Sequence, residues 1–530
     1  MNSISLTSIP KCLGIVDYVF IALTGFIILI VAYLKINSLI FWQYTSDLFM
    51  YDQILQETLQ GNFVLEFTYG SGFGDHSYFF LFFLLPIKAL LRENMVYVLI
   101  LLGPIVYGVS AITAYLYFKH TNGQRQGIIY GVIFLLNFGL TVPGLYEATY
   151  GFHPDILAGF LAIIFTIFLI HYHQLRSLNK TSTKPVFIGL LISFGLFISL
   201  KEEMAVLSIV FFLVLFLWKR ERLYFTFLAG STVFLVLAFW TIKFLQTPFN
   251  RTNDFLAEKF ISSLKVSGPF VLFYQPEPYG NLLPSYWATI VLFLVAMGAA
   301  IWVTKQINAF GVALFVMGLA KMGSSFLVYD FSIFTWHNFP GIIMLTGAVL
   351  IQMSVGGKRD IASIKLLNLA LLVGAVAIFF LFTIPYFLIV QKTMKYNARL
   401  IQNVEPALVD VQKNIEPQRV VTIPPYTAVA WVDGYRYTSY PRGINKSPAG
   451  IADYVVLPSE NNVFSSDFDP DVETPDLYKE FAPIFENDQF ILLKRVQVAE
   501  IHQQDRNTFA RLFNENEDAF IEFPDEATLR

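Results

Sequence analysis

The chain has 530 residues, of which 55% are hydrophobic and only 14% are charged. Soluble domains carry about 25% charged residues, so this composition excludes an ordinary soluble domain and indicates a polytopic membrane protein. The formal net charge of −3 gives no reason to expect a nucleic-acid partner, and the single cysteine, Cys12, excludes an intramolecular disulfide.

About eleven stretches are apolar enough to be membrane-spanning helices, since one span needs about 20 apolar residues. They predict an all-α polytopic domain over residues 1–390. The stretches cover residues 17–36, 95–118, 128–145, 156–173, 186–200, 204–218, 223–246, 285–304, 308–328, 339–355 and 366–390.

The apolar segment 77–92 is short, contains Pro86 and ends in Lys88 and Arg92, so it either spans the membrane or lies along its surface. If it does not span, most loops that contain Lys or Arg fall on one side, which the positive-inside rule makes the cytoplasm. We therefore place it at the outer surface, in an outer loop over residues 37–94. The N-terminus is then cytoplasmic, and the protein is expected to be a multi-pass protein of the cell (plasma or inner) membrane.

The sequence becomes polar from residue 391 onwards. Apolar residues recur at helical spacing over residues 391–415, and strand-like runs follow at 419–423, 452–457 and 490–493, with turn-forming residues between them. Because a helix and short strands alternate, we expect a small extracytoplasmic α/β cap domain over residues 391–530.

In this topology the polar residues that could do chemistry fall at outer helix ends or in outer loops. Ionisable residues at membrane depth are costly and mark functional sites by default. We therefore expect several segments, distant in sequence, to converge on one outer site. The residues are Asp47, Asp52, Asp75, His76, His153, Asp155, Lys201, Glu202, Glu203 and His337.

Asp47 and Asp52 follow Ser46 in the first outer loop. Asp47 could cap the helix that begins here, with Asp52 as a surface residue near the start of that helix. Alternatively, Asp47 is a general base whose carboxylate takes a proton from an acceptor hydroxyl. The pattern leaves both interpretations open.

Two short clusters combine imidazole and carboxylate groups, Gly74-Asp75-His76 and Phe152-His153-Pro154-Asp155. Each could be a turn followed by a helix cap. Imidazole and carboxylate are also suitable ligands for a divalent metal cation, which Asp47, Asp75, His76 and His153 would hold. The clusters lack the fixed spacing of a dedicated metal motif, so both readings stay open.

The charged run Lys201-Glu202-Glu203 lies between two short apolar helices. Lys201 could form an internal pair with a glutamate, or it could bind a phosphate with Glu202 orienting it. His337 opens a later span, and a lone interfacial histidine is more often structural. Its place on the same face favours a role in substrate binding.

These motifs together resemble the domain of unknown function 2079 family of predicted membrane proteins. The resemblance rests on Asp47, Tyr51-Asp52-Gln53, Gly61-Asn62, the two His/Asp clusters, Lys201-Glu202-Glu203 and Ala452-Asp453-Tyr454-Val455-Val456-Leu457. That family in turn is similar to the GT-C glycosyltransferase superfamily, which includes protein O-mannosyltransferases and the lipid A aminoarabinose transferase. The fold it implies is GT-C-like.

The resemblance also implies roles for single residues. Asp47 matches the acid of the first outer loop that acts as base or metal ligand, and Asp155 matches an acid at the start of a later span. Lys201 lies where relatives carry a Thr-Lys-Gly segment that helps to hold lipid phosphate, but Glu202 stands here in place of the glycine. His337 resembles the histidine of a late His-x-x-Arg-Tyr segment whose arginine is absent here.

The function implied by the resemblance is a membrane glycosyltransferase that moves a sugar from a polyprenyl-phosphate-linked lipid to an acceptor at the outer face. Asp47 and Asp155 would be catalytic, and Asp52, His76, Lys201, Glu202 and His337 would bind substrate. A lipid or solute transporter, or a non-catalytic membrane protein that presents the C-terminal domain, is the alternative. A transporter typically places its ionisable groups near mid-membrane and has repeat symmetry, which this sequence lacks.

Overall fold

The structure is a computed structural model, and the fold is described from part of the chain. The described residues are 14–42, 44, 46–62, 65–66, 70–71, 76–136, 151–178, 183–246, 283–324, 337–354, 361–416, 419–424, 427, 430–431, 436–439, 452–459, 462 and 477–497. Asp75 and the side chain of Asp47 therefore lie outside the described part of the protein.

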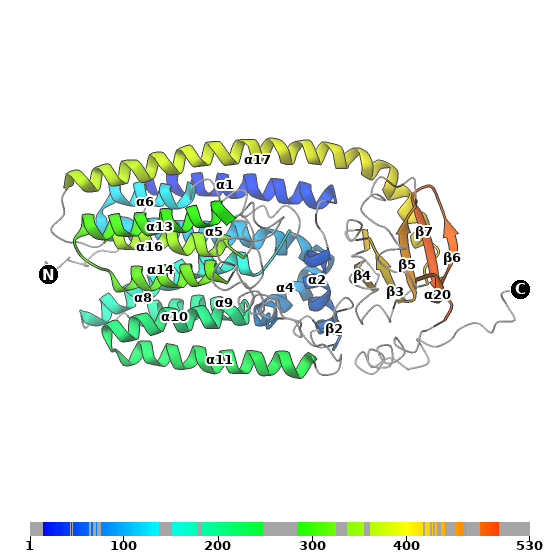
Figure 1. Cartoon of the computed structure of the whole chain (residues 1–530), viewed down its shortest axis with the longest axis horizontal. Helices are drawn as coiled ribbons and strands as arrows, with labels where there is room; N and C mark the ends of the chain where they lie inside the picture. The colour runs from blue at the N-terminus through cyan, green and yellow to red at the C-terminus, as the bar shows by residue number, and fades with distance from the viewer. Residues whose placement is uncertain are drawn as a thin grey trace, which may run out of the picture.

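Most of the described chain forms a bundle of apolar helices that run alongside one another (Figure 1). Each of the eleven predicted apolar stretches falls on one of these helices, wholly or in its described part. The helices are α1 (Ile15–Ile40), α5 (Met95–Asn122), α6 (Gln124–Leu136), α8 (Asp155–Ser177), α9 (Lys184–Ser199), α10 (Glu202–Lys219), α11 (Arg222–Gln246), α13 (Leu283–Thr304), α14 (Ala309–Gly323), α16 (Phe339–Met353) and α17 (Ile361–Gln412).

Five helical stretches of the described chain are long and apolar enough to cross a membrane, and four shorter apolar helices accompany them. The protein is therefore a multi-pass membrane protein. One of the short helices is α16, and all of its residues are buried among other helices. The five stretches are Ile15–Ile40, Phe79–Asn122, Asp155–Ser177, Arg222–Phe244 and Pro284–Thr304.

A layer of short elements covers one end of the bundle. It contains α2 (Ser46–Leu59), the 3₁₀ helix η1 (Phe79–Leu84), α4 (Leu85–Leu91) and η2 (Arg92–Asn94), which leads into α5. The segment 77–92 is thus a 3₁₀ helix followed by a seven-residue helix with Pro86 in its first turn. Neither piece is long enough to span a bilayer alone, as the sequence predicted.

The helix α17 runs from the bundle to a small sheet beyond the covered end (Figure 1). It is continuous over 52 residues, so the predicted domain boundary at residue 390 falls inside a helix. Its last turns bury Val404, Leu408 and Val411, the apolar residues whose spacing predicted a helix here.

The sheet has five strands in the order β4-β3-β5-β7-β6. Strand β3 pairs in parallel with β4 and β5, and β7 pairs antiparallel with β5 and β6. The three predicted strand runs correspond to β3, β5 and β7, whereas β4 and β6 were not predicted. The strands are β3 (Val420–Ile423), β4 (Arg436–Ser439), β5 (Tyr454–Pro458), β6 (Phe481–Glu486) and β7 (Phe490–Arg495), and a separate two-stranded hairpin contains β1 (Leu65–Glu66) and β2 (Gly70–Ser71).

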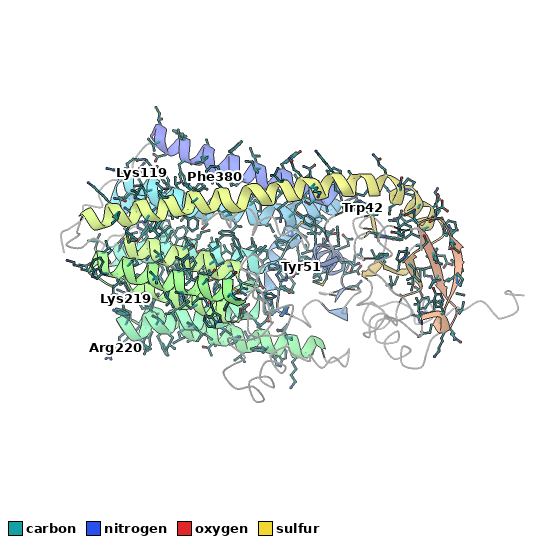
Figure 2. All side chains as sticks on the ribbon, turned by 45° about the horizontal axis from the view of Figure 1, so that its top comes forward. Trp42, Tyr51, Lys119, Lys219, Arg220 and Phe380 are labelled. Carbon is teal, nitrogen blue, oxygen red and sulfur yellow. The ribbon has the colours of Figure 1, made fainter. Side chains whose placement is uncertain are left out.

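The two ends of the bundle differ in charge. Figure 2 shows Lys119, Lys219 and Arg220 at the end remote from the sheet. There, Lys119 Nζ lies 2.6 Å from Asp17 Oδ2 and ties α5 to the start of α1. The predicted histidine and acid residues that the structure describes lie at the other end, in or beside the layer of α2, η1 and α4.

Candidate functional site

Five helix ends meet at the end of the bundle that faces the sheet. The helices α8, α10 and α16 begin there, and α9 and α14 end there. The turn before η1 adds a sixth segment. Together they carry a group of ionisable side chains that we call the outer cluster: His76, His153, Asp155, Lys201, Glu202, Glu203, Lys321 and His337.

Asp155 is the first residue of α8, and it is fully buried. Lys201 Nζ lies 3.5 Å from Asp155 Oδ2, and His153 Nδ1 lies 3.7 Å from the same oxygen. Asp155 Oδ1 has no hydrogen-bond partner among the described residues. A charge-assisted hydrogen bond measures about 2.7–2.9 Å, so the contact between Lys201 and Asp155 is a long one.

Glu202 joins the turn before η1 to the start of α10. His76 Nδ1 lies 2.8 Å from Glu202 Oε1, and the other carboxylate oxygen accepts from the backbone N–H of Ser77 at 3.0 Å. Both oxygens of Glu202 are thus engaged by a segment that lies 125 residues earlier in the chain. Glu202 thus contacts the turn that carries His76, and its role in substrate binding stays a prediction.

Lys321 is a member of the cluster that the sequence analysis missed. Its Nζ lies 2.7 Å from Glu203 Oε2, and the lysine side chain is completely buried near the end of α14. A lysine inside an apolar helix is a signal that could have identified it, because such residues are costly in a membrane. The short distance makes this pair tight, in contrast to Lys201 and Asp155.

His153 and His337 lie in turns outside the helices, and both are held neutral. Burial lowers the pKa of His153 to about 3 and that of His337 to about 2 from their ordinary value. Lys201 and Lys321 add to the lowering in both cases, whereas Asp155 opposes it. These mutual effects connect the predicted residues into a single electrostatic group.

Helix α2 lies directly on the outer cluster. The ring of Tyr51 makes edge-to-face contacts with Tyr78, Phe152 and His153, at centroid distances of 5.3, 5.5 and 6.1 Å. Asp47 occupies the position one helical turn before Tyr51 in α2.

Asp52, which was predicted to bind substrate, forms an ion pair inside the protein. Its two carboxylate oxygens each lie 2.9 Å from Lys88 Nζ, and both side chains are buried. This pair ties α2 to α4. Asp52 thus forms an ion pair at the edge of the site, and its role in substrate binding stays a prediction.

The predicted metal set is only partly described. His76 contacts Glu202, whereas His153 lies beside Asp155, so the two imidazoles have separate acidic partners. Within the part of the chain that the structure describes, no group of three or more His, Cys, Asp or Glu side chains gathers as metal ligands do. Asp75 and the Asp47 side chain lie outside the described residues, so the metal site stays a prediction.

Comparisons with known proteins give a structural likeness at low similarity. No family model and no curated protein matches the chain, so the resemblance to the domain of unknown function 2079 family is not confirmed. One similar structure is ArnT from Cupriavidus metallidurans bound to undecaprenyl phosphate, with a TM-score of 0.43 and 10% identity over 91% of this chain and 98% of that one. Another is the archaeal oligosaccharyltransferase AglB from Archaeoglobus fulgidus in complex with an inhibitory peptide and a dolichol-phosphate, with a TM-score of 0.43 and 12% identity over 86% of this chain and 70% of that one. Both TM-scores lie below 0.5, and they carry no assignment of fold or function to this chain.

Proposed function

We propose that this protein is a GT-C-type membrane glycosyltransferase of about eleven spans that moves a sugar from a polyprenyl-phosphate-linked donor to an acceptor at the outer end of the bundle. The observation that carries the proposal is the outer cluster itself, because buried and half-buried ionisable groups from five chain segments meet there. Burying charge is costly, so a membrane protein that gathers it at one place uses it for chemistry or binding.

Lys201 is the residue that we assign to the donor phosphate. It is 6% exposed, and its Nζ is 3.5 Å from the carboxylate of Asp155, whereas Lys321 is paired with Glu203 at 2.7 Å. Of these two contacts, the one between Lys201 and Asp155 is the longer and therefore the weaker. A lysine beside the phosphate stabilises the negative charge that develops as the sugar leaves.

Asp47 is the residue that we assign to the acceptor. It lies one helical turn before Tyr51, whose ring packs against His153 in the cluster. In the proposed reaction the acceptor oxygen bonds to the anomeric carbon as the bond from that carbon to the phosphate oxygen breaks. The hydroxyl proton passes to the Asp47 carboxylate, and the lipid phosphate leaves beside Lys201.

The position of the charges favours this function over transport. A transporter typically binds its substrate near the bilayer midplane, on broken helices. Asp155 is the first residue of its helix and Lys201 is the N-cap residue of α10. Lys321 is the third residue from the end of α14. These positions are helix ends, so they support chemistry at one surface.

The test uses purified protein in lipid nanodiscs and a polyprenyl-phosphate monosaccharide with a radiolabelled sugar. Water serves as the acceptor, and the measurement is label released from the lipid. Asp47→Asn should lower the rate by about a hundredfold or more, because general-base removal has that effect. Lys201→Met should weaken donor binding, whereas Met at the exposed Lys305 serves as the matched control.

Equal amounts of folded protein are compared, as judged by gel filtration. Asp47→Asn should fold normally because asparagine has nearly the same size and shape as aspartate and Asp47 lies in the first turn of α2. An Asp47→Asn protein with near-normal release would remove the catalytic role of that residue. A wild-type protein that moves the lipid across vesicles without releasing sugar would favour the transporter.

A further inference from the structure

A further buried lysine lies beside the outer cluster, on a helix that contributes none of its members. Lys35 is in α1, five residues before its last residue, and only 2% of it is exposed. Its Nζ donates a hydrogen bond of 2.6 Å to the backbone carbonyl of Gly151. A lysine this close to a helix end usually extends its ammonium group to the membrane surface, but this one points into the protein.

Gly151 begins the turn that leads into α8. Its φ of +72° lies in the left-handed region, which glycine adopts without strain. A Cβ at this position would lie 2.8 Å from the ring of Tyr44, so no larger residue fits. Tyr44 itself lies two residues before α2, and the ammonium group of Lys35 is 5.8 Å from its ring centroid.

Three segments therefore meet at one point: the end of α1, the segment before α2 that contains Tyr44, and the turn before α8. We call Lys35, Tyr44 and Gly151 the clamp. The turn that it holds carries His153 and ends at Asp155, while α2 carries Asp47. The clamp thus sets where α2 begins relative to where α8 begins.

The donor to the Gly151 carbonyl is a charged ammonium group. A hydrogen bond from an ammonium group is roughly twice as strong as one from a neutral amide or hydroxyl donor. The charged donor therefore holds the turn at Gly151 more firmly than a neutral donor would.

We propose that Lys35 is a positioning residue of this site, which acts through the Gly151 carbonyl to fix the turn before Asp155 against the start of α2. This inference rests on the proposed function, since Lys35 would position two groups of the proposed site. They are Asp47, which is assigned to the acceptor, and Asp155, the counterion of Lys201. Lys35 itself contacts backbone and takes no part in the bond-making step. A misplacement of about 1 Å at such a site can lower the rate on the order of a hundredfold.

The first experiment does not depend on transfer activity. Hydrogen exchange is followed by mass spectrometry in peptides that cover residues 151–157 of the full-length protein in nanodiscs. Lys35→Met should raise exchange in this turn, Lys35→Arg should restore protection, and Gly151→Ala should resemble Lys35→Met. The matched control is Lys119→Met, which removes the lysine that ties α1 to α5 at the opposite end of the bundle.

The second experiment measures label release from the polyprenyl-phosphate monosaccharide at saturating and limiting donor. Lys35→Met should lower kcat at least tenfold and change KM by less than about threefold, because Lys201 stays on its own helix. Lys119→Met, compared at equal folded amount, should keep the wild-type kcat. Recovery of kcat in Lys35→Arg would separate positioning from a general loss of stability.

Failure of the clamp inference and failure of the proposed function give different results. Unchanged exchange in residues 151–157 of Lys35→Met overturns the clamp, whatever the activity. Changed exchange with an unchanged kcat overturns the positioning role alone. A wild-type protein that releases no sugar overturns the proposed function, and the exchange result then decides only whether Lys35 holds the turn.

Discussion

The buried ion pair between Lys88 and Asp52 allows a quantitative prediction. Lys88 Nζ lies 2.9 Å from both carboxylate oxygens, and the side chains are 3% and 9% exposed. Removing one partner of such a pair leaves an uncompensated buried charge, which costs about 3–5 kcal/mol of unfolding free energy. Lys88→Met and Asp52→Leu should each destabilise the protein by about this amount.

The double variant Lys88→Met/Asp52→Leu should regain most of the loss. Replacing both members of a buried pair by apolar residues of similar size is often neutral or stabilising. The assay is unfolding in one detergent at constant protein concentration, evaluated as a double-mutant cycle. Additive losses in the double variant would refute the buried pair and return Asp52 to the candidates for substrate binding.

Two further predictions concern pH and topology. The pKa values of His153 and His337, lowered to about 3 and about 2, imply that the unfolded chain binds more protons than the folded one below about pH 6.5. Stability should therefore be constant above pH 7 and fall as pH drops from about 6.5 towards 3, by up to about 1.4 kcal/mol per pH unit for each histidine. Thermal midpoints between pH 8 and pH 4 check this, and a flat profile in the wild type would contradict the buried neutral state. Cysteines introduced at the exposed positions Gln60 and Arg222, in a Cys12→Ser background, should be labelled from opposite sides of the membrane, with Gln60 outside; labelling from one side would refute the topology.

The apolar pattern located the helices, but it did not show which of them are long enough to cross a membrane. Hydropathy marks α14 and α16 as apolar, but it cannot tell a helix facing lipid from one surrounded by other helices. The structure buries every residue of α16 and keeps it at 15 residues. Charge asymmetry between loops predicts an interfacial position for segment 77–92, and the structure shows that it is divided into two short helical pieces.

The outer cluster was predictable where helix ends carry charge, and unpredictable where partners come from elsewhere in the chain. Placing His76, Asp155 and Lys201 at one end follows from alternating helix direction. The pairing of Asp52 with Lys88 does not, because it depends on the angle at which α2 crosses α4. Lys35 was missed because a single lysine in the first span gives no hint of the carbonyl that it binds 116 residues later.

The most direct test of the account is a cryo-electron microscopy map of the protein in nanodiscs that contain polyprenyl phosphate. The account predicts phosphate density within hydrogen-bonding distance of Lys201 Nζ, with the separation from Asp155 increased beyond 3.5 Å and the pair of Lys321 with Glu203 unchanged. Lipid phosphate bound away from the outer cluster, with Lys201 still beside Asp155, would contradict it.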